Sequence, residues 1–211
     1  GKRVQVRSAR MVSFTERHLA LMTYEVRLLE GDAPIVISSQ IVNKEDFDDY
    51  AGRQAAGSDS DPRKNPGLDH RVLRSQMSWH SPRRMILGYR VTNSGMTLAV
   101  GADHRIETRN MYTELDDTTE DQGRKVYRIS AKQGQPIVIT KAVAYHTSRS
   151  VPVRELSDRV RRTLDRVRES GFDCHYEAQR QWLAVQQGRR PALRAHPAHP
   201  RYCAGPSWSA R

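Results

Sequence analysis

Apolar and polar side chains alternate along several short segments in the first two-thirds of the chain. Every second residue of 22–28 is apolar, which is typical of a strand with one buried face. Further runs rich in β-branched residues cover 35–42, 85–92, 96–106, 125–130 and 136–146. We expect 85–92 to pair with 96–106 across Asn93-Ser94-Gly95, and 125–130 to pair with 136–146. Many short strands separated by turns predict a mainly β fold, an antiparallel β-sandwich.

The periodicity changes at residue 153, where apolar positions begin to recur every three or four residues. These positions are Val153, Leu156, Val160, Leu164 and Val167. They predict an amphipathic helix that begins near Pro152 and ends near Gly171. A second, shorter helix is expected over about 173–183, with Asp173 as its N-cap. The pattern therefore predicts a helical linker after the sandwich.

Three segments show no periodicity that would predict a packed element. Residues 50–68 are rich in Gly, Asp, Ser, Pro and Asn, which predicts a long surface loop. Residues 114–123 are acidic and are expected to form a second, solvated loop. From residue 184 onward, arginine, proline, alanine and histidine dominate, and we expect this tail to be disordered. The predicted organisation is a sandwich over 1–149, a helical linker over 150–183 and a tail over 184–211.

Length and composition exclude several classes of protein. The 211 residues suit one ordinary domain with a real core. No apolar run approaches the roughly 20 residues of a membrane helix, and the first residues lack the apolar segment of a signal peptide. The two cysteines, Cys174 and Cys203, are too few for a disulfide scaffold. We therefore expect a cytoplasmic protein with no membrane partner.

The basic charge of the chain is a weak indicator of nucleic-acid binding. The net charge is +11, but five arginines and no acidic residue lie within 188–211, so the excess elsewhere is spread thinly. A nucleic-acid interface concentrates its charge in a patch or stripe. The strongest candidate is the arginine-rich helix over 153–168, yet acidic residues are interleaved there to pair with the arginines, and no aromatic side chains are available for base stacking. These acidic residues are Glu155, Asp158, Asp165 and Glu169. We expect no specific nucleic-acid partner.

Histidine-containing pairs offer only weak catalytic or metal-binding candidates. His196 and His199 are three residues apart, but neighbouring prolines prevent a helix from presenting both to a zinc ion. Asp69-His70 and Asp103-His104 resemble parts of a catalytic triad, but no serine lies in a Gly-x-Ser-x-Gly turn. We expect His104 to be a core or cross-strand residue.

A cluster of carboxylates is the remaining catalytic candidate. Its members are Glu114, Asp116, Asp117, Glu120 and Asp121. Paired carboxylates cleave glycosidic bonds, but the position of this cluster in one polar segment is more typical of a solvated surface. Glycine-rich phosphate loops are absent from the sequence. We therefore assign no catalytic, cofactor-binding or metal-binding residue and expect no cofactor.

Several ordered motifs resemble the N-terminal domain of glycoside hydrolase family 65. The motifs are Arg10-Met11-Val12-Ser13-Phe14, Arg17-His18-Leu19-Ala20, Tyr24-Glu25-Val26, residues 32–43, Asp61-Pro62-Arg63-Lys64, Leu87-Gly88-Tyr89-Arg90 and Ser94-Gly95-Met96-Thr97-Leu98-Ala99-Val100. The match runs from Gly1 to about Leu183, and Gln179-Arg180-Gln181-Trp182-Leu183 looks like the connector of the family. The resemblance thus covers most of the chain.

The resemblance implies a fold and an activity for the intact protein. Members of the family begin with a large β-sandwich, continue through a helical linker and then form an (α/α)6 barrel. They include maltose, trehalose and kojibiose phosphorylases and related hydrolases, which cleave α-linked glucosyl disaccharides with inversion. The barrel carries the general-acid glutamate and the site for inorganic phosphate, the co-substrate of the phosphorylases. The resemblance also implies a homodimer, and it assigns no catalytic residue to this chain.

Two departures from the family pattern accompany the resemblance. Gly1 corresponds to a point inside the family sandwich, so its opening strands are expected to be missing. After Leu183 the likeness stops, which favours out-of-frame translation of the tail; a genuine disordered basic tail is the alternative. The leading interpretation is a non-catalytic N-terminal fragment of a trehalose- or maltose-type enzyme. The alternatives are a standalone carbohydrate-binding or structural sandwich and a basic nucleic-acid binder.

Overall fold

The structure, a computed structural model, describes residues 2–43, 72–186 and 188. Its strands are β1 (Val4–Val12), β2 (Leu19–Leu28), β3 (Ala33–Val42), β4 (Leu73–Ser81), β5 (Arg84–Val91), β6 (Thr97–Thr108), β7 (Met111–Thr118), β8 (Gln122–Ala131) and β9 (Pro136–Ser148). Its helices are α2 (Val153–Ser170) and α3 (Phe172–Gln186). The predicted order of strands followed by two helices is therefore confirmed.

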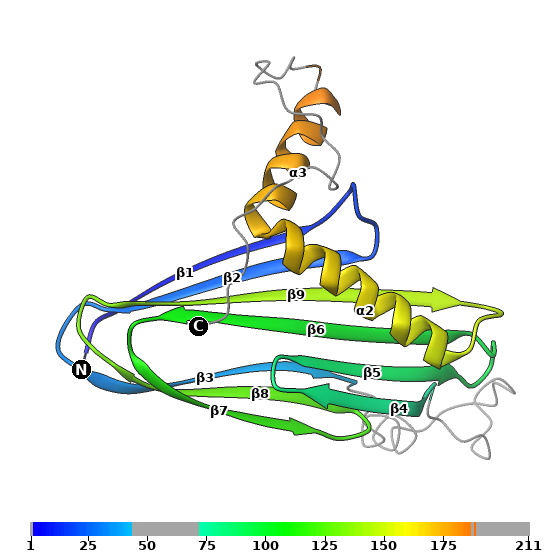
Figure 1. Ribbon diagram of the computed structural model, residues 1–211, viewed down its shortest axis with the longest axis horizontal. Coiled ribbons are helices and arrows are strands. Elements are labelled where there is room, and N and C mark those ends of the chain that lie inside the picture. Colours follow the sequence, from blue (N-terminus) through cyan, green and yellow to red (C-terminus); the bar gives the residue numbers. More distant parts are fainter. Residues whose placement is uncertain (1, 44–71, 187, 189–211) are drawn as a thin grey trace, which may run out of the picture.

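The strands form two antiparallel sheets that pack face to face. One sheet has the order β1-β2-β9-β6-β5-β4, and the other has the order β3-β8-β7 (Figure 1). Buried side chains from both sheets meet between them, among them Leu28, Ile137 and Tyr127. Helix α2 covers the opposite face of the six-stranded sheet, where it contacts β5, β6 and β9. The predicted antiparallel sandwich is confirmed.

The face of the six-stranded sheet that carries buried side chains changes from one end of its strands to the other. In β2, Leu19 and Leu21 pack with α2, whereas Val26 and Leu28 are buried with the opposite alternation. Strand β9 changes in the same way, from Ile137 and Ile139 against the smaller sheet to alanines against α2. Successive side chains of a strand point to opposite faces, so this change shows that the sheet is the middle layer of the molecule.

Helix α2 lies on the sheet because its apolar stripe faces glycines in the strands. All five apolar positions that the sequence indicated are buried. A Cβ atom on Gly101 of β6 would lie 2.6 Å from Cγ1 of Val160, and one on Gly88 of β5 would contact Val153. The helix begins after Pro152 and ends at Gly171, whose φ of 78° suits a glycine. The predicted boundaries of this helix are thus confirmed.

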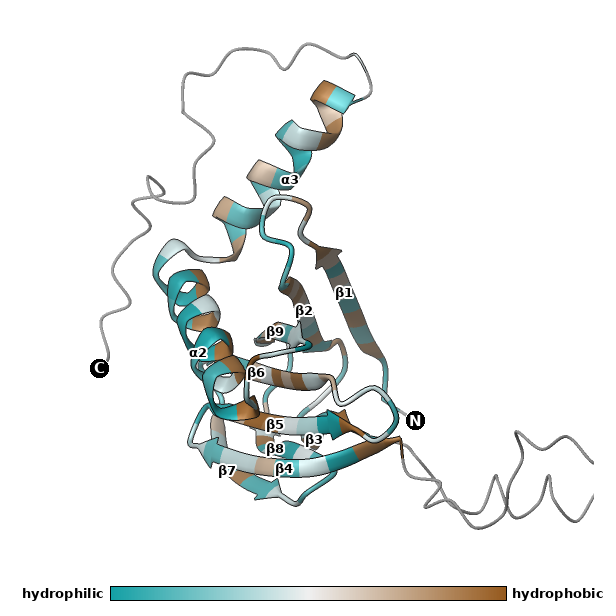
Figure 2. Cartoon of the chain, turned by 90° about the vertical axis from the view of Figure 1, so that its right-hand side faces the viewer, coloured by the Kyte–Doolittle hydropathy of each residue, from teal (hydrophilic) through white to brown (hydrophobic). Residues whose placement is uncertain are grey.

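Helix α3 stands clear of the sheets (Figure 2). Its buried residues are the polar His175 and Gln179. Tyr176, Leu183 and Val185 are exposed, Val185 to 61%. The helix continues through Gln186, three residues beyond the expected end at 183. The sequence thus predicted the existence of α3, and its length was underestimated.

Two expectations about the β module are wrong. Residues 125–130 do not pair with 136–146; they belong to β8, which pairs with β3 and β7, whereas β9 pairs with β2 and β6. The acidic segment 114–123 is not a loop, because residues up to Thr118 form strand β7. The pairing of β5 with β6 is as expected. The predicted loop at 50–68 and nearly all of the predicted tail lie outside the described residues.

Candidate functional site

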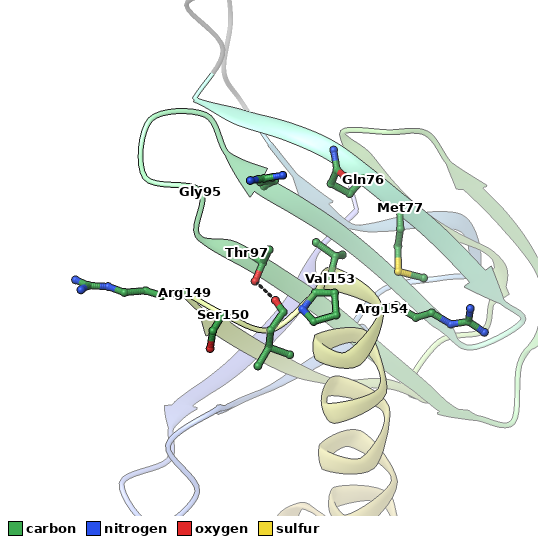
Figure 3. A pocket seen from close by; sticks show the side chains of 11 residues that line it. Gln76, Met77, Gly95, Thr97, Arg149, Ser150, Val153 and Arg154 are labelled. Carbon is green, nitrogen blue, oxygen red and sulfur yellow. Dashed lines mark hydrogen bonds between the residues drawn. The ribbon is translucent and has the colours of Figure 1, made fainter.

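The larger of two hollows considered as candidate sites lies where α2 begins, beside the edge of the six-stranded sheet (Figure 3). It has a volume of about 640 Å³. Strands β4, β5 and β6 and the connection from β9 to α2 supply its walls. The lining residues are Gln76, Met77, Arg90, Gly95, Thr97, Arg149, Ser150, Val151, Pro152, Val153 and Arg154. This is the size of a small-molecule site.

Local features of the chain fix the shape of this hollow. The pairing of β4 with β5 shifts between Ser75 and Met77, so Gln76 is the extra residue of a β-bulge. A bulge reorients side chains and is common beside functional sites. On the opposite wall, the hydroxyl of Thr97 donates a hydrogen bond of 2.6 Å to the carbonyl oxygen of Val151, which holds the start of α2 against β6.

Three arginines give the hollow its chemistry. Arg90, Arg149 and Arg154 line it, and none of the residues that line it is acidic. These arginines make no ion pair with any residue in the described part of the chain. Figure 3 shows Arg149 and Arg154 extending in opposite directions from the centre. The hollow is therefore cationic around its rim, while Met77 and Val153 contribute apolar surface.

A smaller groove of about 170 Å³ lies between the second half of α2 and the sheet. Its apolar lining includes Leu21, Ala142 and Leu164, and Asp103 and Arg168 also line it. Asp103 is not available to a ligand there, since Nε and Nη2 of Arg84 bind its two carboxylate oxygens at 2.5 and 2.7 Å. The same guanidinium reaches Asp165 of α2 at 2.7 Å.

The buried Arg84 acts as a structural clamp. Its side chain is only 9% exposed. Burial opposes its charge, but hydrogen bonds to Asp103 and Asp165 raise the pKa of the guanidinium above its ordinary value. Because these contacts join β5, β6 and α2, the Asp103 carboxylate serves the fold. Of the Asp103-His104 pair, which resembles part of a catalytic triad, the aspartate is thus engaged by Arg84.

His104 lies between the two sheets. Its Nε2 is 2.7 Å from the hydroxyl oxygen of Ser39 in β3. Burial, together with the nearby charges of Lys141 and Lys125, lowers the pKa of His104 to about 3. A neutral imidazole that joins two strands is the core, cross-strand residue that was expected. Asp69, His70, His196 and His199 lie outside the described residues.

The acidic cluster lies on a mostly exposed surface, as expected, and two of its members also contact a buried lysine. Nζ of Lys125, whose side chain is 2% exposed, lies 2.6 Å from Glu114 and 2.8 Å from Asp116. It also donates a hydrogen bond to the carbonyl oxygen of Pro82. An unpaired buried charge is costly, so the two carboxylates compensate the lysine. Asp117 lies 3.8 Å from Arg124, and Asp121 accepts a hydrogen bond from Asn43.

A histidine pair that the sequence did not single out fastens the β1–β2 turn to α2. The rings of His18 and His146 stack with their centroids 4.0 Å apart. Nε2 of His146 is 3.1 Å from the hydroxyl oxygen of Thr163 in α2. Burial, followed by the proximity of His18 and Arg159, lowers the pKa of His146 to about 4. Apart from the polar residue at 163 within the apolar stripe, the sequence carries no signal for this contact.

The exposed face of α2 has the ion pairs that were expected from its sequence, although not all of them. Glu155 contacts Arg159 at 3.2 Å and Arg162 at 3.7 Å. The guanidinium of Arg161 lies 4.2 Å from the ring centroid of Trp79, so this arginine stacks within the protein. The helix therefore uses part of its basic charge internally.

Metal binding and membrane insertion find no support in the described part of the chain. Within residues 2–43, 72–186 and 188, no three His, Cys, Asp or Glu side chains are grouped as metal ligands. Neither α2 nor α3 has the length and apolar character that a bilayer crossing requires.

The described residues form a two-sheet antiparallel sandwich followed by two helices, which defines the fold class of this protein. Residues 1–185 match the glycosyl hydrolase family 65, N-terminal domain. The chain belongs to this family, as the resemblance in its sequence implied.

Relatives and a solved structure support this assignment. An uncharacterized glycosyl hydrolase of Mycobacterium tuberculosis is 30% identical over 185 residues, which are 87% of this chain and 22% of the relative. One of Mycobacterium leprae is 30% identical over 184 residues, 86% of this chain and 22% of the relative. A human-microbiome protein provisionally named a kojibiose phosphorylase superposes with a TM-score of 0.66 at 9% identity, over 86% of this chain and 21% of that chain. This last likeness shows the fold alone. The chain spans about a fifth of the length of these relatives.

Proposed function

We propose that this chain serves as the non-catalytic N-terminal domain of an enzyme that cleaves an α-linked glucosyl disaccharide of the trehalose or maltose type. In this proposal the catalytic acid and the disaccharide site belong to a barrel domain in the same protein. The bond is cleaved with inversion, by water or by inorganic phosphate as co-substrate. The proposal includes a cytoplasmic enzyme that forms a homodimer.

The proposal is supported by the ion pairs that the enclosed carboxylates make within the sandwich. Inverting cleavage needs one carboxylic acid to protonate the leaving oxygen and a second group on the opposite face of the sugar. The carboxylates of Asp103 and Asp116, whose side chains are 12% and 25% exposed, are held by Arg84 and Lys125. The same two cations also contact Asp165 and Glu114. Because these carboxylates are engaged by cations within the fold, they are not free to reach the glycosidic oxygen of a sugar.

Helix α3 supports a role beside a second domain. Its connection to the sandwich is small: the backbone N–H of Phe14 donates a 2.9 Å hydrogen bond to Gln179, the ring centroid of Phe14 lies 4.6 Å from that of Trp182, and Phe172 packs against the core. Other apolar side chains of α3 are left at the surface, among them Tyr176 and Val185 at 49% and 61% exposure. Apolar surface of this kind commonly marks an interface.

The test uses the full-length Mycobacterium tuberculosis relative. Release of glucose from maltose, trehalose and kojibiose is measured with and without inorganic phosphate. We expect turnover of at least one of these disaccharides, and phosphate dependence distinguishes phosphorolysis from hydrolysis. Failure to cleave any α-linked glucosyl disaccharide would contradict the proposed substrate class. Activity on an unrelated bond, such as a β-glucoside, would contradict it equally.

A second candidate function is carbohydrate binding without catalysis. The hollow beside α2 favours it, since its volume of about 640 Å³ and its mixed polar and apolar lining suit a small sugar. Calorimetric titration of the chain with maltose and trehalose tests this function. Saturable heat with either uncharged disaccharide would support it, and the absence of heat would leave the domain in a supporting role.

A further inference from the structure

We propose that the hollow formed by β4, β5, β6 and the start of α2 binds a phosphorylated sugar. This site differs from the disaccharide site of the proposed function, which we place in another domain. The phosphate half of the inference rests on the arginines of the hollow. The sugar half rests on the proposed function.

The charge of the hollow points to an anion. Arg90, Arg149 and Arg154 line it without an acidic neighbour in the lining. All three side chains are exposed and make no ion pair within the described residues, so their guanidinium groups are available to an anion. A phosphate monoester carries a charge of nearly −2 at neutral pH and offers three strong acceptor oxygens, which suit guanidinium donors.

The shape of the hollow points to a ligand larger than an ion. Arg149 and Arg154 extend toward different sides of the hollow (Figure 3), an arrangement that suits an extended ligand better than a compact ion. A ligand that spans the hollow can contact two or more of the guanidinium groups. The volume of about 640 Å³ is within the range of small-molecule sites and is far beyond that of a single phosphate.

The remaining lining supplies partners for a sugar ring. Gln76, the extra residue of the bulge in β4, and Ser150 provide polar groups on two sides. Met77, Pro152 and Val153 supply an apolar surface for the C–H face of a ring. The positive end of the α2 dipole adds a small attraction for the phosphate. A sugar that carries one phosphate can contact the arginines through its phosphate and the remaining lining residues through its ring.

The test titrates the full chain with glucose 6-phosphate at low ionic strength and measures heat and backbone amide shifts. We expect saturable binding with shifts at Gln76, Thr97 and Val153. Each of the variants Arg90→Gln and Arg154→Gln should weaken binding about tenfold, the loss typical of a charge-assisted hydrogen bond. Added salt should weaken it further.

The controls separate the proposed site from simpler explanations. Arg128→Gln removes the same charge from an exposed position on β8, outside the hollow, and should leave the affinity unchanged. Equal loss in Arg128→Gln would show diffuse charge and overturn the proposal. Equal affinity for inorganic phosphate or for glucose alone would overturn it too, as would the absence of binding. Because this titration requires no turnover, its failure is distinct from failure of the relative to cleave a disaccharide.

Discussion

Helices α2 and α3 differ in how they are attached to the sandwich. Helix α2 buries Val153, Leu156, Val160, Leu164 and Val167 against the sheet. Helix α3 buries only His175 and Gln179 and leaves apolar side chains in solvent. Buried apolar area is the main source of stability, so α2 is part of the core of the domain. Helix α3 depends on a few polar contacts and on the packing of Phe172 and Trp182 at its surface. We therefore expect substitutions in α2 to cost more stability than substitutions in α3.

The largest expected effect breaks the packing of α2. Leu164 is 0% exposed, and Leu164→Ala should lower the free energy of unfolding by about 3 to 4 kcal/mol through lost burial and a cavity. Leu183 of α3 is 37% exposed, and Leu183→Ala should cost about 0.5 kcal/mol or less. Urea denaturation of both variants measures the two effects. Equal losses would show that α3 is as well packed as α2.

The ion pairs of Arg84, which also attach α2 to the sheet, provide a second test of how firmly α2 is held. Asp103→Asn leaves a buried guanidinium with Asp165 as its remaining acidic partner and should cost about 3 kcal/mol. The matched control is Asp117→Asn, which removes an exposed carboxylate 3.8 Å from Arg124 and should cost about 0.5 kcal/mol or less. Thermal denaturation distinguishes them, and similar melting temperatures would argue against a structural role for the clamp.

The close approach of α2 to the sheet gives a smaller effect. Gly101→Ala places a methyl group 2.6 Å from Cγ1 of Val160 and should cost about 1 to 2 kcal/mol through overpacking. Val160→Ala provides room for this methyl group. The double variant should therefore lose less stability than the sum of the single variants, and strict additivity in a double-mutant cycle would contradict the contact.

Acid should weaken the contact between the β1–β2 turn and α2. The folded state lowers the pKa of His146 from 6.5 to about 4, so the unfolded chain binds more protons between these pH values. The contribution of His146 is complete above pH 6.5 and is lost as the pH falls toward 4. Denaturation at pH 7 and pH 5 measures the loss. In His146→Gln the pH dependence should shrink; an unchanged dependence would assign it to other groups, such as His104.

The smallest effect concerns α3 alone. Gln179→Ala removes the hydrogen bond from the backbone N–H of Phe14 and should cost about 1 kcal/mol. Amide hydrogen exchange should become faster in α3 and near Phe14, while the amides of α2 keep their protection. Faster exchange in α2 as well would show that the two helices unfold as one unit.

Local patterns predicted the elements of the fold, and long-range pairing limited the rest. Apolar spacing located α2 because one stripe of the helix meets one surface. It failed for the partners of β8, since adjacent strands in sequence need not pair, and β8 joins β3 and β7 in the other sheet. Apolar spacing also failed to predict β7 as a strand, and it gave no sign that Glu114 and Asp116 of this exposed strand contact the buried Lys125.

The candidate hollow could not be predicted from the sequence. Its arginines lie at 90, 149 and 154, on β5, after β9 and on α2, and only the fold brings these positions around one space. The bulge that places Gln76 is likewise a property of the strand register. The family could be predicted, because several ordered motifs are matched along residues 1–185.

The central claim is that this domain supports a disaccharide-cleaving enzyme without performing the chemistry. The most direct measurement incubates the purified chain with maltose, trehalose and kojibiose, with and without inorganic phosphate, and quantifies released glucose. The full-length Mycobacterium tuberculosis relative serves as the reference. The account predicts no release above the uncatalysed background for the chain. Enzyme-dependent release that scales with chain concentration would contradict it.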